Sequence, residues 1–225
     1  MGGERLSRYV LRCGDVPVPI TLAPLAARSA PAIPNDEDLD ETLALLDANS
    51  EQRLIVLGRD SALAAVLTYF LRIERLDIEI AYVAVDRSPA SNVYRSGTGA
   101  AAAKRAVEGQ AFEVPLIRDD LGIALVGRAR INAPGGGKLI GEGFVDDTRI
   151  FHGKANSILV MPTGELPGLR ACAIRSQLRF PKWVAGRAAQ IGADAAVVTR
   201  DGVRGEREIK RASFYRHTTP WLLVR

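Results

Sequence analysis

The feature that most constrains the fold is a repeated succession of strand, turn and helix between residues 54 and 108. An apolar run at Leu54–Leu57 precedes a polar turn and a helical pattern from Ala62 to about Glu74. A second apolar run, at Ile78–Val85, precedes a loop and an alanine-rich helix that ends near Glu108. Strands that alternate with helices in this way predict an α/β domain with a parallel sheet.

The segment before this alternation is rich in proline. Residues 15–34 hold five prolines among small apolar residues, which predicts irregular or edge-like structure because proline breaks helices and lacks a ladder donor. Asn35 follows, with three acidic residues directly after it. This pattern predicts a helix that is capped by Asn35.

The pattern of apolar and turn-forming residues changes after Gly109. Short apolar stretches alternate there with turn signals such as Pro167-Gly168 and Asp201-Gly202, at a spacing typical of all-β architecture. We therefore expect an α/β domain over residues 1–109 and a β-sandwich or folded-over sheet over residues 110–225. The sequence leaves open whether the C-terminal strand returns to pack on the first domain.

Composition excludes several classes of protein. The 225 residues are 47% hydrophobic and 25% charged, which is typical of a globular protein that buries a sizeable core. No apolar run is long enough for a membrane span, and the N-terminus lacks the apolar segment of a secretory signal. Two cysteines and two histidines are too few and too widely spaced for a metal cluster. We therefore expect a cytoplasmic protein.

The basic residues are mostly arginine. The net charge is +4, and 25 of the 30 basic residues are arginines. Arginine suits phosphate and carboxylate groups, so the excess favours an anionic partner such as a nucleotide or a lipid headgroup, unless it only reflects genome composition. No basic run with interleaved aromatic residues is present, so we do not expect nucleic-acid binding.

Two loops at predicted strand ends are candidate ligand sites, because backbone N–H groups and helix dipoles converge there. In the first, Gly58 frees the backbone to turn, Asp60 could order the loop or approach a metal ion, and Ser61 could cap the helix. In the second, Pro89 stiffens the turn, and the side chains of Ser91 and Asn92 offer hydrogen bonds. Each loop taken alone also fits ordinary turn and cap chemistry.

A third, less distinctive turn that could receive an anion is Gly97–Gly99. Two acidic pairs, Asp119-Asp120 and Asp146-Asp147, fit solvated turns at strand ends better than paired catalytic carboxylates. The two tryptophans, Trp183 and Trp221, fit anchors of the core better than ligand platforms.

Together these features resemble the diacylglycerol-kinase-like lipid kinases, over roughly residues 50–225. The stretch Leu54–Leu63 is similar to the strand and Gly-Gly-Asp-Gly-Thr turn of that family, and Pro89–Asn92 looks like a shortened form of its second loop. Phe144–Val160 resembles the family's aspartate-containing hairpin, and Val197–Gly202 resembles its late Asp-Gly turn.

The resemblance implies a diacylglycerol kinase/NAD kinase-like architecture, in which ATP-Mg²⁺ and a lipid meet in a cleft between an α/β domain and a β-sandwich domain. It implies nucleotide contacts at two loops, a metal contact at Asp60, and a second-domain contribution to the cleft from Asp201 and Gly202. The nucleotide-contacting residues would be Gly58, Arg59, Asp60, Ser61, Pro89, Ser91 and Asn92.

This chain departs from the family pattern at positions that bear on catalysis. Arg59 stands where the family has a second glycine, and Ser61-Ala62 stands where it has Gly-Thr. Val203 occupies the position of a glutamate that is a candidate general base, and valine cannot accept a proton. The Asn-Pro-x-Ser-Gly turn of the family is also missing. We therefore assign no catalytic residue.

Three hypotheses follow from these observations. The first is a catalytically impaired relative that uses no cofactor and binds an anionic small molecule, a lipid headgroup or a protein partner. The second is an active ATP- and Mg²⁺-dependent lipid kinase in which Arg59 neutralises phosphate charge. The third is an interaction module that forms a homodimer through its β half, or that contacts a membrane peripherally through its arginine-rich surface.

Overall fold

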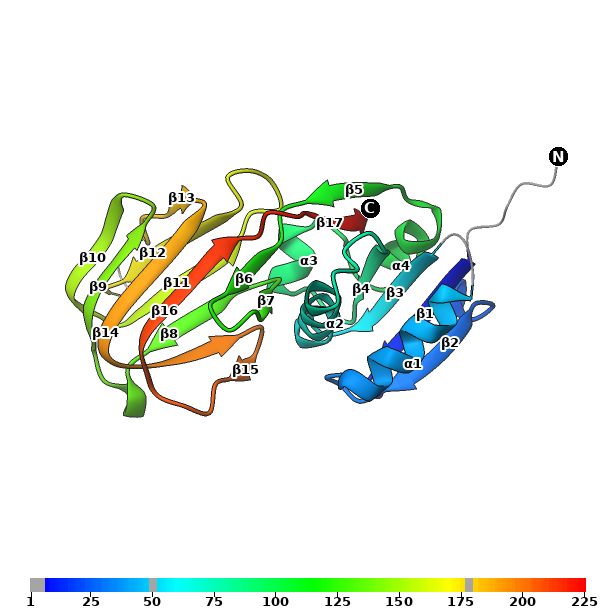
Figure 1. Ribbon diagram of the computed structural model, residues 1–225, viewed down its shortest axis with the longest axis horizontal. Coiled ribbons are helices and arrows are strands. Elements are labelled where there is room, and N and C mark those ends of the chain that lie inside the picture. The colour runs from blue at the N-terminus through cyan, green and yellow to red at the C-terminus, as the bar shows by residue number, and fades with distance from the viewer. Residues whose placement is uncertain (1–6, 49–51, 177–179) are drawn as a thin grey trace. The chain divides into compact units, whose positions relative to one another are not determined.

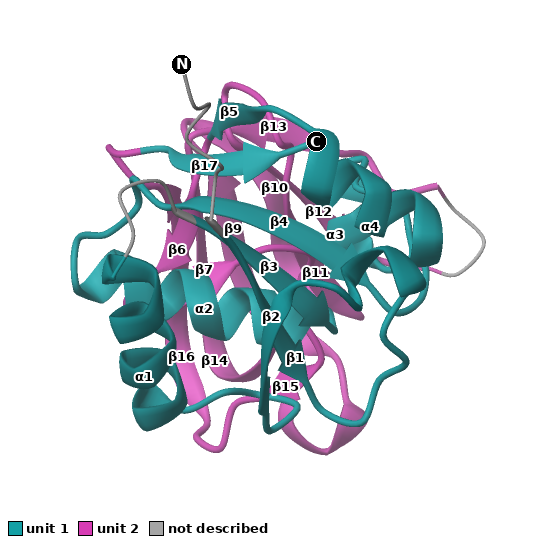
Figure 2. Cartoon of the chain, turned by 90° about the vertical axis from the view of Figure 1, so that its right-hand side faces the viewer, with its two compact units in different colours: residues 1–114, 220–225 teal, residues 115–219 magenta. Residues whose placement is uncertain are grey.

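The computed structural model describes residues 7–48, 52–176 and 180–225, and the chain divides into two compact units. The first unit contains residues 1–114 and 220–225, and the second contains residues 115–219 (Figure 2). We expected the boundary near Gly109, whereas the chain passes between the units after Val114. The last residues of the chain belong to the first unit, because β17 pairs with two strands of its sheet.

The first unit contains a six-stranded sheet (Figure 1). Its strands, in order across the sheet, are β2 (Ala26–Ala30), β1 (Ser7–Cys13), β3 (Gln52–Gly58), β4 (Glu79–Ala84), β17 (Trp221–Val224) and β5 (Ala111–Val114). The pairings are parallel except for β17 with β5. The proline-rich segment supplies a short 3₁₀ turn, Ile20–Leu22, and the edge strand β2, as predicted.

Helices connect these strands. They are α1 (Asp36–Asp47), α2 (Asp60–Arg72), the short α3 (Pro89–Val93) and α4 (Gly99–Glu108). Asn35 caps α1 as predicted: its side chain accepts from the Asp38 N–H, and the Asp38 carboxylate accepts from the Asn35 N–H. One core cluster joins α4 to the sheet through alanines of the helix and through Ile55, Leu57 and Val83 of the strands. The prediction of an α/β domain with a parallel sheet is confirmed.

The C-terminal strand is anchored by its first residue. Trp221 is fully buried, and its ring meets the ring of Tyr94 edge to face at 5.2 Å between centroids. Edge-to-face aromatic pairs contribute beyond the area they bury. Trp221 is thus the core anchor that the sequence suggested, whereas Trp183 is only partly buried.

The second unit consists of antiparallel strands. They are β6 (Ile117–Asp119), β7 (Ala124–Leu125), β8 (Ala129–Asn132), β9 (Leu139–Val145), β10 (Thr148–Ala155), β11 (Ser157–Pro162), β12 (Leu169–Ile174), β13 (Val184–Gly186), β14 (Ala188–Arg200), β15 (Val203–Arg204) and β16 (Ile209–Arg216). A 3₁₀ turn, Pro134–Gly136, precedes β9.

The long strand β14 organises this sheet. Its first part pairs with β9 and β16, its last four residues pair with β8, and the register shifts between Gly192 and Ala196. The strands on both sides of this register shift contribute to one apolar core, which includes Phe151, Ile158 and Phe214. The second unit is therefore the folded-over, sandwich-like sheet that the sequence predicts.

Among the residues that the structure describes, none of the helices combines the length and the apolar character needed to cross a bilayer.

Candidate functional site

The turn between β3 and α2 has ordinary extended geometry. Arg59 is the N-cap of α2, with φ −91° and ψ 170°, and its side chain is exposed. The helix begins at Asp60, so Ser61 is its second residue and not the cap that we expected. Neither Gly58 nor Arg59 adopts the positive φ that favours glycine, so this turn does not present the bare glycine backbone of a phosphate loop.

Gly58 is explained by packing. A Cβ atom placed on Gly58 would lie 2.9 Å from Cys13 Cβ and 3.2 Å from Ala62 Cβ. Glycine is therefore needed where β1, β3 and α2 approach one another, and not to give the backbone freedom to turn.

The carboxylate of Asp60 is engaged in three hydrogen bonds. Its Oδ1 accepts from the Tyr82 hydroxyl at 2.7 Å and from the Ser88 hydroxyl at 2.5 Å. Its Oδ2 accepts from the Ala90 N–H at 3.0 Å, and the residue is 7% exposed. Asp60 therefore joins the start of α2 to the segment after β4, which is the loop-ordering role that the sequence left open.

The hydrogen bonds of Asp60 bear on the metal contact that the family resemblance implies. The three hydrogen bonds use three of the roughly four lone pairs of the Asp60 carboxylate, so a Mg²⁺ ion would find one lone pair of Oδ2 left to bind. Over the described parts of the chain, no group of three or more His, Cys, Asp or Glu side chains could hold a metal ion. The metal and nucleotide contacts implied by the family resemblance remain predictions.

The second predicted loop is a helical turn, α3. Ser88 is its cap and forms a reciprocal capping box with Ser91, while Pro89 occupies the first turn, where a missing N–H costs nothing. Ser91 is buried, and Asn92 is exposed and accepts from Arg87 Nε at 2.9 Å. The structure thus brings the two predicted loops together through Asp60, with most of their polar groups already bonded within the protein.

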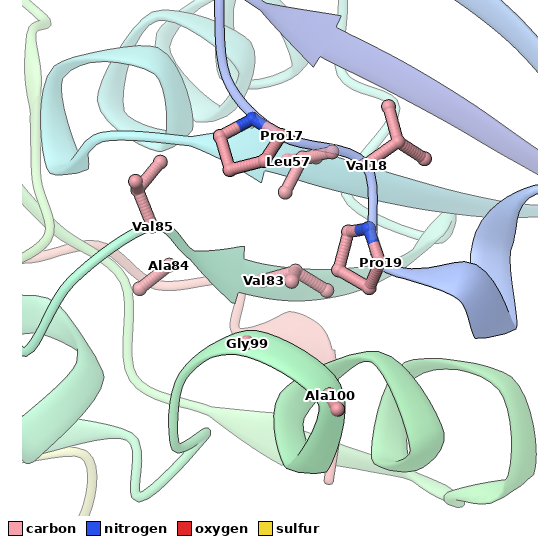
Figure 3. A pocket seen from close by; sticks show the side chains of 9 residues that line it. All are labelled: Pro17, Val18, Pro19, Leu57, Val83, Ala84, Val85, Gly99 and Ala100. Atoms are coloured by element: carbon pink, nitrogen blue, oxygen red, sulfur yellow. The ribbon is translucent and has the colours of Figure 1, made fainter.

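A pocket lies beside these loops in the first unit (Figure 3). Its volume is about 220 Å³, and it is lined by Pro17, Val18, Pro19, Leu57, Val83, Ala84, Val85, Gly99 and Ala100. The lining is apolar, and it includes none of the seven residues predicted to contact a nucleotide. Sequence reasoning missed it because its walls come from four separate segments, at residues 17–19, 57, 83–85 and 99–100.

The one sequence signal near this pocket is the Gly97–Gly99 turn. Gly97 and Gly99 have φ of 75° and 56°, and a Cβ on Gly97 would lie 2.5 Å from Arg105 Nη1. Thr98 is the N-cap of α4 but makes no side-chain capping bond. The first N–H groups of α4, at the pocket wall, are therefore free of a side-chain cap, and such groups favour negative charge.

The aspartates of the second unit also bind backbone. The Asp201 carboxylate accepts from the N–H groups of Val126, Gly127 and Arg128 at 2.8–3.0 Å, and Gly202 completes the turn with φ 88°. Val203, the residue at the expected position of the general base, is 44% exposed. Asp201 and Gly202 therefore have a structural explanation, and their place in a substrate cleft remains a prediction.

Of the two acidic pairs, Asp119 differs from the expected solvated turn, whereas Asp146 is exposed as expected. Asp119 is fully buried, accepts from the N–H groups of Leu121 and Ile123, and forms an ion pair with Arg200 at 2.5 Å. Asp146 accepts from the N–H groups of Arg187 and Ala188. Both carboxylates hold strand ends together through backbone N–H groups.

The cysteines do not supply a nucleophile. Burial raises the pKa of Cys13 to about 12, with a smaller contribution from Asp38, and burial raises the pKa of Cys172 to about 11. A thiol must ionise to attack, so both remain unreactive near neutral pH.

Comparison with known proteins identifies the fold. No protein-family model and no curated protein matches the sequence. A diacylglycerol kinase from Bacillus anthracis strain Sterne superposes with a TM-score of 0.71 at 12% identity, over 98% of this chain and 97% of that one. The chain has the diacylglycerol kinase fold. An NAD kinase from Archaeoglobus fulgidus in complex with ATP (TM-score 0.62, 13% identity, 97% and 93% coverage) and a yeast NADH kinase (0.57, 10%, 97% and 83%) share it more distantly.

Proposed function

We propose that this protein has the diacylglycerol kinase fold without its phosphotransfer activity, and that it acts by binding a ligand in the pocket of the first unit. The observation that carries the proposal is the Asp60 carboxylate, whose three hydrogen bonds tie α2 to α3. The family resemblance assigns a metal contact to Asp60, whereas here its carboxylate connects two loops by hydrogen bonds.

Phosphoryl transfer depends on positioning and on charge neutralisation. A triphosphate packs against exposed glycine backbone, but the turn at Gly58–Ser61 carries the exposed side chain of Arg59. The Asp60 carboxylate in the same turn is hydrogen-bonded to protein donors. Val203 cannot accept a proton, and the nearby Glu206 and Glu208 are exposed. The Arg59 side chain, the hydrogen-bonded Asp60 carboxylate and the missing base at Val203 all disfavour catalysis.

The pocket suggests the chemistry of the ligand. Its proline, valine, leucine and alanine walls favour an apolar group of modest size. The uncapped N-terminus of α4, at Gly99 and Ala100, favours a carboxylate or phosphate at the edge of that group. The proposed ligand is therefore amphipathic, with an apolar body and an anionic head.

A phosphotransfer assay tests the loss of catalysis. The full chain is incubated with radiolabelled ATP, Mg²⁺ and a panel of neutral lipids that includes diacylglycerol. We expect no labelled lipid above the background without protein. Turnover that saturates with ATP and is lost in Asp60→Asn, in protein shown to be folded, would overturn the proposal.

Ligand binding is tested separately by thermal shift, since a ligand that binds only the folded state raises the melting temperature. We expect short-chain fatty acids or lysophosphatidic acid to raise it, and Val18→Asp, which places a charge in the pocket wall at a 42% exposed position, to remove the shift. Ile20→Asp, at an 86% exposed position outside the lining, is the control. Equal shifts in the two variants would contradict binding in this pocket.

An active ATP-dependent kinase is the second candidate. It is favoured by the ATP-bound Archaeoglobus fulgidus NAD kinase, which shares the fold, and by the glycine turn at Gly97–Gly99. A rise in melting temperature with ATP-Mg²⁺ would support this candidate, and no rise at millimolar concentration would exclude it.

A further inference from the structure

One edge of the sheet in the first unit is an open strand. Strand β2 ends the order of the sheet, and among the described residues it pairs with β1 alone (Figure 1). The C=O of Ala30 accepts from the N–H of Gly14, which directly follows β1, at 2.9 Å. Backbone groups alternate between the two sides of a strand, so those of Ala27 and Ser29 point away from β1. The edge therefore presents the N–H and C=O groups of these two residues to a further strand.

Strand β2 lacks the features that protect such an edge in a monomer, which are charged side chains, bulges or a covering segment. Its register with β1 has no bulge, and its side chains are small except for Arg28, which forms an ion pair with Glu41 of α1. The opposite edge strand of the same sheet, β5, is different. It carries the exposed Glu113, and the Arg225 guanidinium lies over its Phe112 ring.

The chain on both sides of Arg28 is uncharged and mostly apolar. Residues 16–27 and 29–34 contain no charged side chain. Two of their large apolar side chains are exposed, Ile20 by 86% and Ile33 by 47%. Exposed apolar side chains that gather around an open sheet edge indicate a surface that is covered by another chain.

We propose that two copies of this chain pair through β2, in antiparallel orientation, about a twofold axis at Arg28. In this register Ala27 of each copy lies opposite Ser29 of the other, and each of these two pairs exchanges two backbone hydrogen bonds. Every backbone group of Ala27 and Ser29 that points away from β1 then has a partner. The contact is isologous, because the same strand contributes the same groups from both copies.

The residues around β2 favour a second copy over a different partner. Symmetric pairing places residues 23–25 of one copy beside residues 31–33 of the other, so that apolar side chains meet on both sides of the axis. At the axis the two Arg28 side chains lie opposite each other, where like charges repel. Each arginine, however, is ion-paired with Glu41 and lies 3.9 Å from the Asp38 carboxylate. The carboxylates of both copies therefore offset that repulsion.

Sedimentation equilibrium of the full chain tests the dimer, which does not depend on the proposed function because no residue of β2 lines the pocket. We expect a reversible dimer of twice the chain mass of 24.2 kDa. Ser29→Pro removes an N–H that points away from β1, which edge strands tolerate, and should weaken the dimer about 30-fold because two hydrogen bonds between the copies are lost. Ser29→Ala keeps that N–H and should dimerise like the parent chain. A parent chain that stays monomeric at its highest soluble concentration, which would leave the edge to a strand of another protein, or equal dimerisation of the two variants, would overturn the proposal.

Disulfide trapping tests the register without a proline. In the proposed pairing, residue 28 lies opposite its own counterpart at about 4.5 Å between Cα atoms, a separation that a disulfide can bridge. Arg28→Cys should therefore form a covalent dimer under mild oxidation, and both native cysteines are buried. Ala30→Cys is the control, because it lies opposite Ala26 of the second copy and too far from its own counterpart for a disulfide. Equal cross-linking of the two variants, or none in either, would contradict this register.

Discussion

The hydroxyl of Tyr82 lies 2.7 Å from the Asp60 carboxylate, so a residue within β4 holds the first residue of α2. Both residues are buried, and the Ser88 hydroxyl shares the same oxygen. A carboxylate in this arrangement stabilises the strand ends of the first unit. It also gives Asp60 a structural role in a turn that lacks the glycines of a phosphate loop.

Replacing Asp60 by alanine should destabilise the protein by about 3 kcal/mol, because three buried donors lose their acceptor at roughly 1 kcal/mol each. Tyr82→Phe should cost about 1 kcal/mol, and much less when Asp60 is already alanine. Urea unfolding of the two single variants and the double variant measures this coupling. Asp77→Ala, at an exposed carboxylate, is the control. Additive costs would contradict a direct Asp60–Tyr82 interaction.

Gly58→Ala should destabilise the protein by about 1–3 kcal/mol, because the new Cβ lies too close to Cys13 Cβ. Gly192→Ala is the matched control, since a Cβ there meets nothing within 4 Å. Thermal unfolding of both variants measures the difference. Unchanged stability in Gly58→Ala would contradict this packing explanation.

Arg200→Met should destabilise the second unit by about 3–5 kcal/mol, because it leaves the buried Asp119 carboxylate without its ion-pair partner. Adding Asp119→Asn should recover part of that loss, since the uncompensated charge is then removed. Chemical unfolding, monitored by the protease resistance of residues 115–219, measures the stability of this unit. A double variant less stable than Arg200→Met would contradict the explanation.

Stability should fall as the pH is lowered below about 6.5. Burial, with a smaller contribution from Arg118, lowers the pKa of His217 in the folded state, whereas the unfolded chain keeps the ordinary value near 6.5. The unfolded state therefore binds the proton first, and folding becomes less favourable as pH falls through that value.

Melting temperatures measured between about pH 7.5 and pH 5.5, above the range of most carboxylates, test this. His217→Gln should show a weaker dependence on pH than the parent chain. The same dependence in both proteins would assign the effect to other groups.

Local signals predicted much of the fold. Asn35 with its acidic neighbours marked the start of α1, and the apolar run at Leu54–Leu57 marked β3, because caps and buried strands depend on neighbouring residues. The return of β17 to the first unit could not be predicted. Its position depends on pairing with β4 and β5, which are more than one hundred residues away along the chain.

The candidate site was predicted only in outline. The sequence placed the 58–61 and 88–92 segments at neighbouring strand ends, and the structure joins them. It could not show that Tyr82, one residue of an apolar strand, would hold Asp60. Nor could it bring Pro17–Pro19 to the wall of a pocket, since loop placement depends on tertiary packing.

The central claim is that the turn after β3 no longer serves a nucleotide. Isothermal titration of the full chain with ATP-Mg²⁺, repeated with Arg59→Gly, tests it most directly. We expect no saturable heat in either protein, because the Asp60 oxygens remain bound to Tyr82, Ser88 and Ala90. Saturable Mg²⁺-dependent binding by the parent chain, lost in Asp60→Asn that remains folded, would contradict it.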